Sequence, residues 1–250
     1  MKINSLGGHL FSVKLHDSYE LLYLSPIKID GIFKRGGIPI LFPQFGNLGS
    51  LTKHGFARDL FWEEVSMKIK GDEISYKYIL DNNQKSNSIW EFDFKVILTF
   101  CLVKNKTLSI KMQVLNLGEH SFSFTGGLHP YFAINCRKNL KINGLQGVDY
   151  IDTDPMITSF DLNSCDGIER LFLSNCDLEF FNGFYNLKLS ISGFENWMIW
   201  NPGKNGAIKI IDLPDNDFDK FICIEPVIAN NSIMLESGQS FQGELIIRMI

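Results

Sequence analysis

The stretch TLSIKMQV, residues 107–114, alternates polar and apolar side chains without a break. Successive side chains of a β-strand point to opposite faces, so this period of two predicts a strand with one face in a core and one in water. The same alternation returns at residues 73–78, 91–96, 121–124 and 188–192. The repeated pattern is typical of an antiparallel sheet protein.

Composition favours the same fold class. The chain has 250 residues with 21 phenylalanines, while only four alanines occur in it. Alanine is the best helix former and aromatic residues suit half-buried strands, so the balance favours sheet over helix. No apolar period of 3.6 persists beyond about two turns. No Pro-, Gly- or Ser-rich linker divides the chain, so we expect residues 1–250 to form one all-β domain, an antiparallel β-sandwich with many strands.

Charge and cysteine content argue against several classes of protein. The net charge is −4 and Lys and Arg form no long run, so no nucleic-acid partner is expected. The start MKINSLGGHLF lacks the apolar core of a signal peptide, and no stretch reaches the ~18 apolar residues of a membrane span. Five widely spaced cysteines without a CxxC pair argue against a disulfide framework or a structural zinc site. We therefore expect a cytoplasmic protein with free thiols and no membrane contact, and we expect a monomer.

Two residues before prolines stand out as candidate site residues, His129 and Glu225. The residue before a proline is pushed towards extended geometry, so both are expected near strand ends, projecting into one concavity if the sheet curves. Glu225 interrupts an apolar run, where a carboxylate is costly to bury unless it is paired. It is therefore either part of a structural ion pair or a tuned acid or base. His54, which lies among aromatic residues, fits a structural role and a site role about equally.

An acidic segment at residues 212–220, DLPDNDFDK, places Asp215, Asp217 and Asp219 at alternate positions, like the opening of a calcium loop. The turn glycine is missing, and Pro226 stands where the closing glutamate belongs. We therefore predict a solvated turn and no metal site.

Five stretches that break the strand alternation together resemble a known family. They are, in chain order, RGGIPILFPQFG (35–46), HGFAR (54–58), GGLHPYF (126–132), WNPG (200–203) and CIEP (223–226). Their order and content resemble the aldose 1-epimerase family, most closely its hexose-6-phosphate mutarotase branch, and the resemblance covers roughly residues 30–245. It implies a large antiparallel twisted β-sandwich of the galactose mutarotase type, and interconversion of the α and β anomers of a sugar.

The resemblance also implies roles for particular residues. Glu225 would be the base that takes the proton of the C1 hydroxyl, and His129 the acid that protonates the ring oxygen. His54 would bind the ring oxygen or a neighbouring hydroxyl. Glu169 stands where the family has a sugar-binding aspartate, and this departure leaves its role less defined. The chemistry needs no metal or redox cofactor.

Arg35 and Arg58 would hold a phosphate, because a guanidinium fork matches phosphate geometry and the resemblance puts a phosphate clamp at these positions. The alternative is a structural ion pair with a carboxylate such as Asp59 or Glu63. The expected partner is therefore a small sugar phosphate, glucose 6-phosphate being the leading candidate. Two other functions stay open, an epimerase for unphosphorylated aldoses and a non-catalytic carbohydrate-binding or sensor protein on the same fold.

One geometric expectation follows for HGFAR. On an extended strand, the four residues from His54 to Arg58 would span about 13 Å, which is longer than a hexose ring. If both side chains serve one sugar phosphate, the segment must bend, and Gly55 is the residue that allows it.

Overall fold

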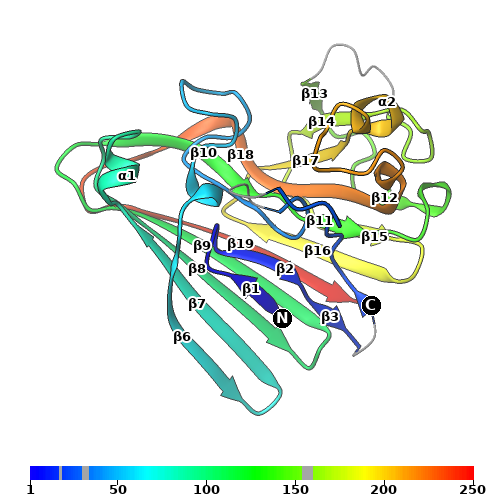
Figure 1. Ribbon diagram of the computed structural model, residues 1–250, viewed down its shortest axis with the longest axis horizontal. Helices are drawn as coiled ribbons and strands as arrows, with labels where there is room; N and C mark the ends of the chain where they lie inside the picture. Colours follow the sequence, from blue (N-terminus) through cyan, green and yellow to red (C-terminus); the bar gives the residue numbers. More distant parts are fainter. Residues whose placement is uncertain (17–18, 30–33, 154–159) are drawn as a thin grey trace.

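The computed structural model describes residues 1–16, 19–29, 34–153 and 160–250, and it consists of two large antiparallel sheets with a shared core (Figure 1). The prediction of an all-β, antiparallel twisted sandwich is confirmed. In the eight-stranded sheet the strands run in the order β12 (Lys141–Asn143), β15 (Leu178–Phe181), β16 (Asn186–Ser192), β19 (Ser240–Met249), β9 (Thr107–Asn116), β8 (Phe94–Val103), β7 (Glu73–Asp81) and β6 (Glu63–Lys70).

The second sheet carries the long strand β18, drawn in orange in Figure 1. Its order is β13 (Tyr150–Asp152), β14 (Ile168–Phe172), β17 (Asn196–Asn201), β18 (Phe221–Leu235), β10 (Phe122–Leu128) and β5 (Ile40–Leu41), with β11 (Tyr131–Ala133) also paired to β18. Two small pairings, β1 (Lys2–Asn4) with β2 (His9–Ser12) and β3 (Lys14–Leu15) with β4 (Tyr19–Glu20), complete the strands.

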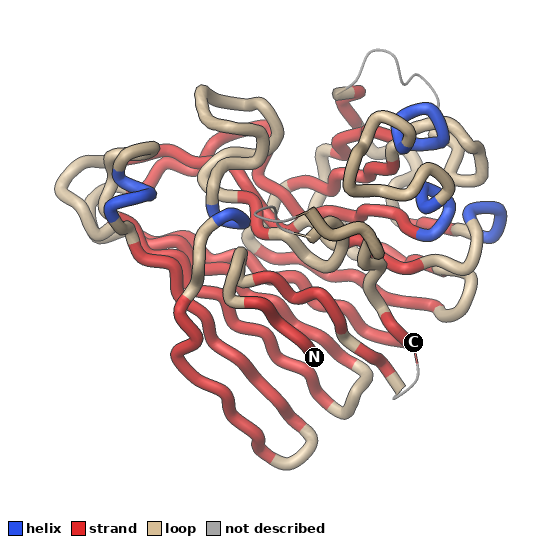
Figure 2. The backbone as a smooth tube through the Cα atoms, viewed as in Figure 1, coloured by secondary structure: helices blue, strands red, loops and turns tan. Residues whose placement is uncertain are grey.

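Helices are short and lie outside the sheets (Figure 2). They are α1 (Gln84–Asn87), α2 (Gly203–Ala207) and the 3-10 turns η1 (Ala57–Asp59), η2 (Arg137–Asn139) and η3 (Asp217–Lys220). Among the described residues, no helix has the length and apolar character needed to cross a membrane. All five cysteines are free thiols, as expected.

The alternation in TLSIKMQV marks β9 correctly. Leu108, Ile110, Met112 and Val114 are buried in the shared core, while the residues between them are half-exposed. The predicted strands at 73–78, 121–124 and 188–192 fall within or overlap β7, β10 and β16.

The prediction for 91–96 is wrong in its first half, because β8 begins only at Phe94. The residues just before β8 do not pair as a strand, and their aromatic side chains pack against Phe122 instead. Trp90 and Phe92 both lie against Phe122, with ring centroids 4.8 and 5.5 Å away. Side-chain packing therefore overrides the period-two pattern here.

Candidate active site

His129 and Glu225 face each other across a break in the second sheet. On one side of the break Gly127 pairs with Val227, and on the other Tyr131 pairs with Cys223. Between these pairs the chain leaves β10, passes through His129–Pro130 and enters β11, so His129 stands in register with Glu225. Nε2 of His129 lies 3.4 Å from Oε1 of Glu225.

The break explains how a proline is tolerated inside a long strand. Proline cannot donate to a β-ladder, so it is excluded from fully paired central strands. Pro226 lies in the interval of β18 where neither β10 nor β11 is paired to it. The expectation of an extended backbone at Glu225 is confirmed, but the expected strand end is wrong, because β18 runs on to Leu235. His129 does follow the end of β10, as predicted.

Burial sets the protonation of the pair. Burial, reinforced by the charge of Glu169 and opposed by Lys53, raises the pKa of Glu225 well above its usual value. Burial lowers the pKa of His129 well below its usual value, and the nearby imidazole of His54 and the charges of Arg58 and Arg35 act in the same direction. Among the described residues, Nδ1 of His129 and Oε2 of Glu225 are buried without a hydrogen-bond partner. Both shifts favour a neutral imidazole beside a neutral carboxyl group in the free protein.

The HGFAR segment bends where we expected. His54 and Gly55 both have left-handed backbone, with φ of 72° and 71°. A Cβ on Gly55 would collide with the carbonyl oxygen of Phe42, so the position requires glycine. The chain then turns into η1, which carries Arg58.

His54 presents its second nitrogen to the same site. The backbone N–H of Gly46 donates to Nδ1 of His54 at 3.2 Å, which leaves the proton of the neutral ring on Nε2. Burial, together with the charges of Arg58, Lys53 and Arg35, lowers the pKa of His54 to about 3. Its ring centroid lies 5.6 Å from that of His129. His54 is thus a neutral hydrogen-bond donor beside the buried pair.

Arg35 is held in place by two partners. Nε donates to Oδ1 of Asp212 at 2.9 Å, and a terminal nitrogen donates to the Tyr131 hydroxyl at 3.1 Å. Arg35 therefore forms an arginine–carboxylate pair, and its partner is Asp212. The fork of Arg35 is oriented by these bonds. The Arg58 guanidinium donates to the backbone oxygen of Lys53 at 2.9 Å.

The prediction that residues 212–220 form a solvated turn is wrong for part of the segment. Asp217 is buried; it accepts from the Tyr23 hydroxyl at 2.7 Å and pairs with Lys220 at 2.7 Å. Asp212 supports Arg35. These carboxylates serve as structural partners because elements distant in sequence pack against the segment.

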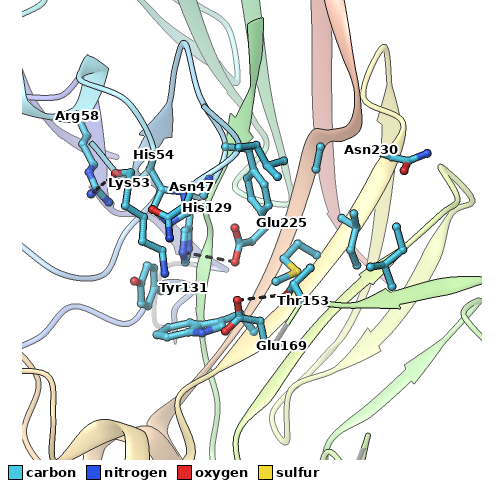
Figure 3. Close-up of a pocket in the computed structure, with 18 of the residues that line it drawn as sticks. Asn47, Lys53, His54, Arg58, His129, Tyr131, Thr153, Glu169, Glu225 and Asn230 are labelled. Atoms are coloured by element: carbon cyan, nitrogen blue, oxygen red, sulfur yellow. Dashed lines mark hydrogen bonds and ion pairs between the residues drawn. The ribbon is translucent and has the colours of Figure 1, made fainter. Parts of the chain in front are cut away.

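All six predicted site residues line one cavity of about 600 Å³. They are Arg35, His54, Arg58, His129, Glu169 and Glu225. Figure 3 shows Glu225 beside His129, with Lys53 reaching into the same space and Glu169 on the facing wall.

Glu169, on β14, accepts a hydrogen bond from the hydroxyl of Thr153 at 3.3 Å. Tyr131 and Trp200 add aromatic walls, and the Tyr131 ring stacks on His129 at 4.8 Å between centroids.

Two further residues of the site, Lys53 and Asp212, are not predicted by the sequence motifs. Lys53 lines the cavity as a third cation, and its position directly before HGFAR was the available signal. Asp212 accepts a hydrogen bond from Arg35, which lies 177 positions earlier in the chain, and nothing in the local sequence indicates that pairing.

The fold and the cavity define a galactose mutarotase-like β-sandwich protein. A crystal structure of a "putative mutarotase" from Salmonella typhimurium superposes with a TM-score of 0.87 at 25% identity, covering 99% of this chain and 85% of that one. A galactose 1-epimerase from Lactobacillus acidophilus shares the fold alone, with a TM-score of 0.76 at 12% identity over 98% of this chain and 89% of that one.

Family membership follows from the sequence comparison. The family model described as aldose 1-epimerase matches residues 1–248, so the chain belongs to the aldose 1-epimerase family. Relatives named "Putative glucose-6-phosphate 1-epimerase" occur in Cenchrus ciliaris, at 27% identity, and in Escherichia coli K12, at 29%. The first alignment covers 98% of this chain and the second 90%, and each covers 79% of the relative.

Proposed function

We propose that the protein interconverts the α and β anomers of a hexose 6-phosphate, with glucose 6-phosphate as the substrate. The observation that carries the proposal is the buried pair of His129 and Glu225, which opens into a cavity that also holds Lys53, Arg35 and Arg58. Membership in the aldose 1-epimerase family and the names of two relatives support the same activity.

The buried pair suits the proton transfers of ring opening. Opening a pyranose removes the proton of the C1 hydroxyl and adds a proton to the ring oxygen, and both oxygens are bonded to C1. In our assignment the carboxyl proton of Glu225 first passes to His129. The resulting carboxylate then takes the proton of the C1 hydroxyl while the His129 imidazolium gives its proton to the ring oxygen. The pair then holds a neutral carboxyl group and a neutral imidazole, the state that burial favours. Rotation about C1–C2 and the reverse transfers close the ring as either anomer.

The cations of the cavity suit a phosphate group. Arg35, Arg58 and Lys53 bring three positive charges, and Asp212 offsets one of them. With Glu169 on the facing wall counted as well, one net positive charge remains, which favours an anionic group such as a phosphate monoester of about −1.5 to −2 at neutral pH. Asp212 and Tyr131 hold the Arg35 fork in a fixed orientation, which favours paired hydrogen bonds to phosphate oxygens.

His54 and Glu169 complete the proposed sugar site. The Nε2–H of His54 would donate to the ring oxygen or an adjacent hydroxyl. The Glu169 carboxylate, already bonded to Thr153, would accept from sugar hydroxyls on the facing wall.

The test is the rate of anomer exchange, measured by NMR exchange spectroscopy on glucose 6-phosphate and glucose in parallel. We expect catalysed exchange with a clear preference in kcat/KM for the phosphorylated sugar. Equal kcat/KM for the two sugars would favour an epimerase for unphosphorylated aldoses. Tight binding of the sugar phosphate without any exchange would favour a carbohydrate-binding or sensor protein.

A further inference from the structure

The proposed mechanism leaves one buried reactive group beside the catalytic pair unused, the thiol of Cys223. Cys223 precedes Glu225 by two positions on β18, so their side chains project from the same face of the strand. It is fully buried and pairs in register with Tyr131 on β11 and with Trp200 on β17. The thiol therefore lies behind the catalytic pair, in a small apolar cluster with Tyr131 and Phe221 rather than in the core between the sheets.

The donor atoms of His129, Cys223 and Glu225 all lie within 4.8 Å of one another. Zinc binds imidazole nitrogen and carboxylate oxygen at about 2.0–2.2 Å and thiolate at about 2.3 Å, so tetrahedral zinc ligands lie about 3.3–3.8 Å apart. The 3.4 Å between Nε2 of His129 and Oε1 of Glu225 already falls in this range. A modest movement of the Cys223 side chain would complete the set.

The same residues have unused bonding capacity. Among the described residues, Oε2 of Glu225 is buried without a hydrogen-bond partner, so the carboxylate is available for bidentate coordination. A divalent ion with one thiolate, one carboxylate and one neutral imidazole forms an uncharged complex, which a buried site tolerates far better than a lone ion. Mixed N, S and O donors suit Zn²⁺ and not the oxygen-preferring Ca²⁺ or Mg²⁺.

We propose that His129, Cys223 and Glu225 form an inhibitory Zn²⁺ site, in which the metal occupies the acid and base and excludes the sugar. Binding would displace the thiol proton and any proton on the carboxyl group to solvent. The metal is an inhibitor here and takes no part in the reaction. The binding claim is independent of the proposed function, and only the claim of inhibition rests on it.

Direct binding is tested with Cd²⁺ on the sugar-free protein, because a cadmium–thiolate bond gives an ultraviolet charge-transfer band. We expect the band in the wild-type protein to saturate at one Cd²⁺ per chain, to disappear with a chelator and to weaken on addition of glucose 6-phosphate. Cys223→Ser should lose the band, and Cys165→Ser, which removes an exposed thiol, should keep it. No band from the wild-type protein, or an unchanged band in Cys223→Ser, would overturn the site.

Inhibition is tested by Zn²⁺ titration of anomer exchange, with each variant compared with its own metal-free rate. We expect competition with the sugar, and an inhibition constant that rises about tenfold or more in Cys223→Ser, since loss of even an outer-shell partner of a metal typically costs that much. Cys223→Ala provides a second variant if the serine is poorly tolerated. If no exchange is catalysed but the Cd²⁺ band depends on Cys223, the metal site stands and the proposed function falls.

Discussion

His129 and Glu225 occupy matching positions in two segments that do not pair, since the pairings Gly127–Val227 and Tyr131–Cys223 enclose them symmetrically. Each is followed by a proline, which lacks the N–H that a continuous ladder would need. The two prolines thus belong to the interval that lets the imidazole and the carboxyl group meet at 3.4 Å inside a sheet. The break in pairing is what forms the proposed catalytic centre.

Glu225→Gln should abolish most of the activity while keeping the fold. Glutamine has nearly the same shape and is neutral, as burial favours for Glu225, but it cannot accept or return the C1 proton. We expect exchange by NMR to slow by about 10²–10⁴-fold, the typical contribution of a general base. Glu236→Gln, at an exposed residue, serves as the matched control. A rate for Glu225→Gln equal to the wild-type rate would refute the assignment of the base.

Arg58→Ala should weaken catalysis selectively on the phosphorylated sugar. Hydrogen bonds to charged groups contribute about 1.5–3 kcal/mol, so we expect kcat/KM for glucose 6-phosphate to fall roughly 10- to 150-fold. The kcat/KM for glucose should change little, because glucose has no phosphate. Arg248→Ala, at an exposed position on β19, is the control with the same change of charge. Equal losses on both sugars would show that Arg58 acts through structure and not through phosphate.

The sequence predicts those parts of this protein that local rules govern. Alternation gives β9, and the X-Pro motifs and the family resemblance single out His129 and Glu225. The sequence does not predict features that depend on packing between segments distant in the chain. Phe92 belongs to an aromatic cluster instead of a strand, and Arg35 is paired with Asp212 from a segment that looks like a solvated turn. Neither contact leaves a periodic signal, because each depends on the register of sheets assembled from the whole chain.

Gly55→Ala should destabilise the protein more than Gly71→Ala does, although both glycines have left-handed backbone, with φ of 71° and 57°. A Cβ at Gly71 meets no atom within 4 Å, so only backbone strain of about 1–2 kcal/mol applies. A Cβ at Gly55 also collides with the carbonyl oxygen of Phe42, and relief of the collision would displace His54. We expect a larger loss of unfolding free energy in urea and a loss of activity for Gly55→Ala alone. Equal destabilisation by the two substitutions would refute the role of the close approach.

His9 should make the fold sensitive to acid. It is buried with Nε2 at 2.7 Å from the carbonyl oxygen of Gly36, next to Arg35, and burial lowers its pKa from 6.5 to about 4, partly offset by that hydrogen bond. Above pH 6.5 both the folded and the unfolded states hold a neutral ring, so stability is unaffected. As the pH falls from 6.5 towards 4, the unfolded state takes up a proton that the folded state does not. The contribution of His9 to the free energy of unfolding should therefore fall by up to about 1.4 kcal/mol per pH unit, in addition to the contributions of the buried His54 and His129.

Urea unfolding at several pH values between 7.5 and 4 measures this dependence of stability on pH. His9→Gln removes one titrating ring, so it should lower stability near neutrality and make the decline between pH 6.5 and 4 less steep, while the buried His54 and His129 still contribute to that decline. His120→Gln, at an exposed side chain, should leave the wild-type dependence unchanged. The hydrogen bond between His9 and the carbonyl oxygen of Gly36 holds the segment that carries Arg35. His9→Gln should therefore also raise KM for glucose 6-phosphate more than KM for glucose. An equally steep decline in His9→Gln would assign the acid sensitivity to other groups.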